Sequence, residues 1–252
     1  MDYSTPKSHM DYIVCLVGLN VPIHLCIFKY KSYYRGLAMN QNILFDIDKI
    51  IFRLKEKRQI FVSEADFQLE MAWIIKYEYP DAKVRLEYTP QFNSDMHIDI
   101  LVIIKNSWIP IELKYKTKRC TKELDDEFYN LKNHGAKDVN CYKYLKDIQR
   151  IESIRTNTVK FVEGYTVFIT NDLSYMRKPT KENCVYKDFS LEEGIIKTGI
   201  LNWAENTGAG TKKNCEEPIE LKGKYKVHWE VFSKIDDTST GTFVYLANRI
   251  CK

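Results

Sequence analysis

Three charged residues, Asp99, Glu112 and Lys114, lie inside a strongly apolar stretch in the middle of the chain. A carboxylate or an ammonium buried without a partner is costly, so charges in such a stretch need one another or a ligand. Two carboxylates within reach of each other can hold a cation between them. We therefore begin with these three residues as candidates for a functional site.

The stretch has the pattern of a β-hairpin, with two β-rich runs, 98–104 and 109–115, around the polar tetrapeptide 105–108. The first run is apolar at nearly every position, which predicts cover on both of its faces. The second run alternates, so Glu112 and Lys114 point to the same side. The charges are therefore expected within strands and not in a loop.

The register decides whether the three charges meet. A loop of even length centred between Asn106 and Ser107 makes Asp99 face Lys114, and Glu112 then lies diagonally across from Asp99. The Cβ atoms would be roughly 5 Å apart for the direct pair and about 7 Å for the two carboxylates. An odd loop would turn Asp99 to the opposite face. The even loop therefore predicts one convergent site.

A helix precedes the hairpin and carries another candidate. Ser63 is a suitable N-cap, Pro80 marks the end, and the helix is expected over 64–78. Glu64 lies one turn before Phe67 on the predicted buried stripe, which continues through Met71, Ile74 and Ile75. We therefore expect Glu64 to point toward the core side.

Other elements follow the order helix, three strands, helix, strand, which predicts an α/β fold. Beyond the hairpin and the helix at 64–78, the pattern predicts a helix at 43–57, a strand at 83–88, helices at 122–132 and 139–154, and a strand at 160–170. Short strands follow at 198–203, 219–232 and 242–247.

This order predicts three regions: a leader of uncertain structure at 1–38, a core at 39–172, and a β-rich extension at 173–252 that packs on the core. The apolar stretch 13–28 is short and interrupted for a membrane span. A signal or anchor function of the leader and a true start at Met39 are both left open.

Composition sets limits on function. The 252 residues have a formal net charge of +4, which is compatible with nucleic acid binding and does not establish it. Seven scattered cysteines without a C-x-x-C pair argue against a disulfide framework or a zinc site and predict a cytoplasmic protein. Two local clusters of basic residues are candidates for phosphate contacts or simply solvated surface: Lys114, Lys116, Lys118 and Arg119 form one, and Lys143, Lys146 and Arg150 form the other.

The helix with Glu64, the strand with Asp99 and the following Glu112-Leu113-Lys114 resemble the PD-(D/E)XK, or restriction-endonuclease-like, nuclease superfamily. The resemblance covers about residues 60–172 and is greatest to uncharacterised bacterial members. Ile98 stands where the motif has proline. The resemblance implies a restriction-endonuclease-like core, with a mixed sheet flanked by helices.

It also implies roles for individual residues. Asp99, Glu112 and the backbone carbonyl of Leu113 would ligate Mg²⁺, with Mn²⁺ as a substitute, and Glu64 would support the site. Hard oxygen ligands suit Mg²⁺, and Lys114 would orient the attacking water and stabilise the developing negative charge. A second interpretation of Glu64 is a first-turn carboxylate favoured by the helix dipole.

Two classes of function follow, with a purely structural salt-bridged hairpin as a third. The first is a Mg²⁺-dependent nuclease acting on DNA in defence, repair or mobile-element biology. The second is a nucleic-acid- or protein-binding module that keeps the fold without turnover. A homodimer is left open, and membrane association is not expected. The residues expected to contact nucleic acid are Lys116, Lys118, Lys143, Lys146 and Arg150.

Overall fold

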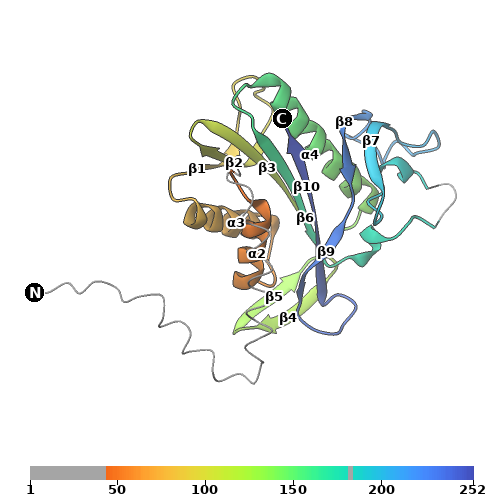
Figure 1. Ribbon diagram of the computed structural model, residues 1–252. Helices are drawn as coiled ribbons and strands as arrows, with labels where there is room; N and C mark the ends of the chain where they lie inside the picture. Colours follow the sequence, from red (N-terminus) through yellow and green to blue (C-terminus); the bar gives the residue numbers. More distant parts are fainter. Residues whose placement is uncertain (1–43, 181–183) are drawn as a thin grey trace, which may run out of the picture. The chain divides into compact units, whose positions relative to one another are not determined.

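The computed structural model describes residues 44–180 and 184–252 (Figure 1). Its main element is a six-stranded mixed sheet in the order β1-β2-β3-β6-β10-β9, in which β3 and β6 form the parallel pair. The α/β class predicted from the sequence is confirmed, whereas the leader at 1–38 and the alternative start at Met39 lie outside the described residues. The strands are β1 (Lys83–Tyr88), β2 (Ile98–Ile104), β3 (Ser107–Lys116), β6 (Glu163–Thr170), β9 (Trp229–Lys234) and β10 (Thr242–Cys251).

Helices cover both faces of this sheet. On one face lie α2 (Ile47–Lys57) and α3 (Glu64–Glu78), and α3 begins where predicted, with the Ser63 hydroxyl accepting from the Asp66 N–H at 3.1 Å. The buried Tyr115 of β3 packs there against Phe67 of α3. The other face is covered by α4 (Lys137–Asn157), which connects the hairpin region to β6.

The hairpin of β2 and β3 has a two-residue turn at Lys105 and Asn106, with φ values of 48° and 70°. Such values belong to the tight turns that match the twist of paired strands. Ile100 pairs with Ile111, so the predicted register, centred one residue later, is wrong by two positions. The even loop length was correct, and a shift of two positions does not change which face a residue occupies.

The prediction of a helix at 122–132 is wrong. This segment forms a second hairpin, β4 (Cys120–Leu124) and β5 (Glu127–Leu131), which pair with each other. Asp125 and Asp126 make its turn with φ values of 52° and 64°, in the left-handed region that Asp and Asn tolerate better than most residues.

The C-terminal region contributes to two sheets. Strands β7 (Ile196–Leu201) and β8 (Ile219–Lys226) pair with each other, and β8 packs against α4. The last strand, β10, pairs with β6 and thereby joins the main sheet together with β9. Two short 3₁₀ helices, η2 (Leu173–Met176) and η3 (Lys187–Phe189), precede β7. No helix in the described part of the chain is long and apolar enough to cross a membrane.

Candidate metal and nuclease site

Carboxylates replace backbone pairing where β2 and β3 separate. The two strands pair as far as Ile100 and Ile111. Beyond that pair, Oδ2 of Asp99 accepts from the Leu113 N–H at 2.6 Å, and Oε2 of Glu64 accepts from the Tyr115 N–H at 2.7 Å. The free edge of β3 therefore fixes two of the predicted site residues through its own N–H groups.

Glu112 lies on the face of β3 that α4 covers, and its side chain is fully buried. Each of its carboxylate oxygens is 3.3 Å from a guanidinium nitrogen of Arg150. Its Oε1 nevertheless has no hydrogen-bond partner among the described residues. Burial raises the pKa of Glu112 well above its usual range, and the charges of Asp147 and Asp99 raise it further.

Lys114 projects from β3 on the same face. Its ammonium lies 2.6 Å from Oδ2 of Asp147 and donates to the backbone carbonyl of Leu113 at 3.0 Å. Burial opposes the positive charge, but the charge of the ion-paired Asp147 prevails, so the pKa of Lys114 is raised. The lysine is therefore held as a cation.

Asp99 sits between these groups. Burial raises its pKa to about 6, although the hydrogen bond from the Leu113 N–H and the charge of Lys114 act in the opposite direction. Nearby Asp147 and Glu87 also raise the pKa of Asp99 through their charges. A bound cation would remove the cost of keeping these carboxylates ionised.

Two residues of α4 belong to the cluster, and the sequence did not assign them to it. Asp147 is buried and is in contact with Lys114 and Arg150. Arg150, which was predicted to contact nucleic acid, turns its guanidinium inward to Glu112 and also donates to the carbonyl of His97. The signal that could have found Asp147 is its helical spacing, three residues after Tyr144 and four before Ile151, which puts it on the face of α4 that the structure buries.

Gln68 is a further contact that the sequence did not indicate. One turn after Glu64 on α3, its side-chain amide donates to the backbone carbonyl of Asp99 at 2.8 Å and to Oε1 of Glu87 at 2.6 Å. The spacing of four residues between Glu64 and Gln68 puts both on one helix face, which is the signal that could have found it. Gln68 fixes the backbone that carries Asp99.

The four predicted nucleic-acid-binding lysines differ in their surroundings. Lys116 pairs with Glu64 at 2.7 Å, and Lys118 pairs with Asp172 at 3.0 Å. Lys143 is exposed on α4, and Lys146 lies with Arg150 on the wall of a hollow of about 430 Å³. Neither Lys143 nor Lys146 forms an ion pair within the described ranges.

The donor set fits Mg²⁺ in its chemistry. Asp99, Glu112 and the Leu113 carbonyl supply hard oxygens, and the buried Oε1 of Glu112 lacks a hydrogen bond. Mg²⁺ usually keeps several waters and needs only one or two protein carboxylates. No preformed group of three or more His, Cys, Asp or Glu residues with metal-binding geometry exists in the described part of the chain.

Comparisons of the chain with protein-family models, with curated proteins and with solved structures gave no match.

Proposed function

We propose that the protein is a Mg²⁺-dependent nuclease with a restriction-endonuclease-like core of the PD-(D/E)XK type, acting on DNA. The observation that carries this proposal is the convergence of Asp99, Glu112 and Lys114 at the point where β2 and β3 separate. Glu64 reaches the same strand edge from α3. This grouping agrees with the roles that the sequence resemblance implies.

Asp99, Glu112 and the carbonyl of Leu113 would hold the metal. When bound, Mg²⁺ would polarise a phosphodiester oxygen and lower the pKa of a bound water. The ammonium of Lys114, oriented by Asp147, is suited to position that water and to stabilise negative charge on the phosphate. Its raised pKa favours this electrostatic role over proton abstraction.

Substrate binding would use the lysines around the site. Lys143 and Lys146 lie on α4, which also carries Arg150 to Glu112. Because they have no ion-pair partner in the described ranges, they can contact phosphates without breaking an internal salt bridge. Neutralising both should flatten the salt dependence of DNA binding by roughly one unit of slope per lost contact.

The alternative is a nucleic-acid- or protein-binding module without turnover. The pairing of Arg150 with Glu112 favours it, because the guanidinium supplies the positive charge that a metal would otherwise bring. In a binding module this internal pair would be permanent, and divalent metal would have no effect on the protein.

A cleavage assay distinguishes the two functions. Purified protein is incubated with plasmid and single-stranded DNA in Mg²⁺ or in EDTA, as wild type and as Lys114→Met. Cleavage that requires Mg²⁺ and falls by roughly 10²-fold or more in Lys114→Met is expected, which is the scale of losing one positioned electrostatic group. Lys83→Met, in an exposed position of β1 that pairs with Ile103 at the far end of β2, should cleave like wild type.

DNA binding is measured on the same variants. It should change little in Lys114→Met, because contacts with phosphates elsewhere remain. Wild-type protein that binds DNA but cleaves none with Mg²⁺ or Mn²⁺ would contradict the nuclease proposal and support the binding module.

A further inference from the structure

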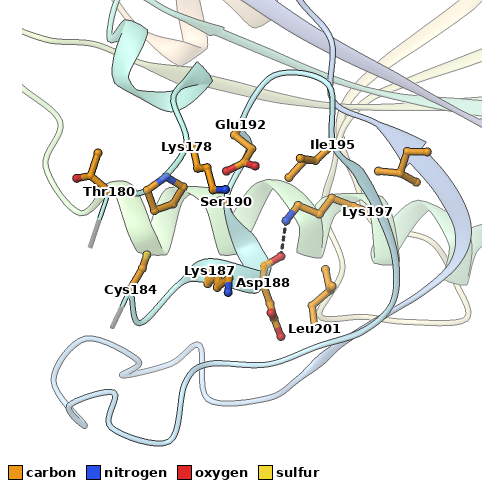
Figure 2. Close-up of a pocket in the computed structure, with 12 residues that line it drawn as sticks. Lys178, Thr180, Cys184, Lys187, Asp188, Ser190, Glu192, Ile195, Lys197 and Leu201 are labelled. Carbon is orange, nitrogen blue, oxygen red and sulfur yellow. Dashed lines mark hydrogen bonds between the residues drawn. The ribbon is translucent and has the colours of Figure 1, made fainter. Parts of the chain in front are cut away.

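A pocket of about 520 Å³ lies in the C-terminal region and shares no lining residue with the candidate metal site. Its described walls come from residues 178–180, from Cys184, from η3, from β7 and from the segment between η3 and β7 (Figure 2). Pockets that bind small molecules generally have volumes of a few hundred to a thousand cubic ångströms. The space is therefore adequate for a small organic ligand.

Among the charged residues of the described lining, Lys197 is the one that is buried. The residue is only 6% exposed, and its Nζ donates to the backbone carbonyl of Asp188 at 2.6 Å, as Figure 2 shows. An ammonium has three N–H donors, so two are left over after this bond. Lys197 forms no ion pair with any carboxylate of the described residues. Burial lowers its pKa to about 8.

This arrangement leaves a buried positive charge without an ion-pair partner among the described residues, although the charges of Asp188 and Glu192 act on it. Such a charge is costly unless a partner of opposite sign compensates it. The lysine could have extended into solvent from β7 instead, as charged side chains of strands usually do. An anion in the pocket would supply the missing partner.

The rest of the lining limits what the anion can be. The hydroxyl of the buried Ser190 has no hydrogen-bond partner in the described ranges and can donate to the same ligand. Ile195 and Leu201 give the pocket an apolar wall. Among the described lining residues, Asp188 and Glu192 also bring carboxylates to the pocket, whose charges act on Lys197.

We propose that this pocket binds a small monocarboxylate, with its carboxylate group on Lys197 and Ser190 and its apolar part against Ile195 and Leu201. One buried ammonium and one buried hydroxyl match the two oxygens of a single carboxylate. A phosphate dianion would need more donors and would be repelled by the carboxylates of Asp188 and Glu192. The pocket contains no arginine in its described lining, although arginine is the usual partner of phosphate.

Calorimetric titration of the full-length protein tests this proposal with acetate, butyrate and hexanoate, and with inorganic phosphate for comparison. Affinity should rise roughly fourfold for each added CH₂ that becomes buried, and phosphate should not compete. Lys197→Met keeps the length of the side chain and should abolish binding. Lys224→Met, on an exposed position of the neighbouring strand β8 outside the pocket, should bind like wild type.

Equal binding by wild type and Lys197→Met, or binding of phosphate alone, would overturn the proposal, as would the absence of binding by every carboxylate in the series. A measurement on the wild type avoids any failure of the variant to fold. The ¹³Cε resonance of Lys197 is titrated with pH by NMR, with and without hexanoate. A bound carboxylate should raise the pKa of Lys197, and an unchanged pKa in saturating hexanoate would contradict the proposal.

Discussion

The ammonium of Lys114 lies 2.6 Å from the carboxylate of Asp147, which α4 carries across the face of the sheet. Both side chains are largely buried, with 14% and 6% of their surfaces exposed. The pair explains how a lysine remains charged in an apolar environment, since burial alone would lower its pKa. It also fixes the direction of the ammonium relative to Asp99 and Glu112.

Asp147→Asn should lower DNA cleavage by about 10²-fold if the protein is the nuclease that we propose, because a displaced catalytic group can cost that much. The pKa of Lys114 should fall in the same variant, since its main partner charge is gone. NMR titration of Lys114 measures this change independently of activity. An unchanged pKa of Lys114 would show that Asp147 does not control the lysine.

Asp99→Asn should stabilise the metal-free protein at neutral pH. The pKa of Asp99 is raised to about 6 in the folded state, so the folded state binds the proton more tightly than the unfolded state. The carboxyl therefore contributes stability below about pH 4, and this contribution is lost as the pH rises through 6. The gain for Asn at pH 7 should reach about 3 kcal/mol at most.

Urea unfolding at pH 4 and pH 7 measures this difference, which should be much smaller at the lower pH. Added Mg²⁺ should stabilise the wild type at pH 7 but not Asp99→Asn, because metal stabilises only the state that binds it. If Asp99→Asn is less stable than wild type at pH 7 without metal, burial does not make the ionised form of Asp99 unfavourable, and the argument is wrong.

Arg150→Met should destabilise the metal-free protein by about 3 kcal/mol at neutral pH, because it leaves buried Glu112 without its positive partner. The same change should increase the affinity for Mn²⁺, since the metal no longer competes with an internal cation for Glu112. Chemical unfolding and calorimetric titration measure the two effects. Lys143→Met, exposed on the same helix, should change neither. Weaker Mn²⁺ binding by Arg150→Met would mean that the arginine helps to hold the metal.

The parts of the fold that the sequence predicted correctly are those that depend on residues close together in the chain. The strand at 83–88, the helix at 64–78 and the parity of the hairpin follow from apolar periodicity and capping, which a short segment determines by itself. The helix expected at 122–132 was wrong because its charged residues fit a helix as well as a hairpin, and Asp125-Asp126 is a weak turn signal. The pairing of β10 with β6 depends on contacts distant in sequence, which a local pattern does not contain.

The sequence predicted the site residues of β2 and β3, but it did not place the two residues of α4 in the site. The types and alternation of Asp99, Glu112 and Lys114 place them on one face, even with the register wrong by two positions. Asp147 and Arg150 lie on α4, and only the packing of that helix on β3 and β6 shows that Asp147 neutralises Lys114 and that Arg150 neutralises Glu112. A charge that projects from a helix looks like a solvated residue until its tertiary partner is known.

Gly164→Ala should change the candidate site by displacing α4, which packs over this position of β6. A Cβ at this position of β6 would lie 2.5 Å from Cγ2 of Ile151 and 3.1 Å from Pro110, so α4 would have to move away from the sheet. Overpacking of this kind costs typically 1–3 kcal/mol, and the displaced helix should separate Asp147 from Lys114. We therefore expect lower stability in urea and a lower pKa of Lys114.

Gly135→Ala, where a Cβ meets nothing within 4 Å, is the matched control. Removing the clashing methyl with Ile151→Ala should recover part of the loss in the double variant, and strictly additive effects of the two changes would contradict the contact.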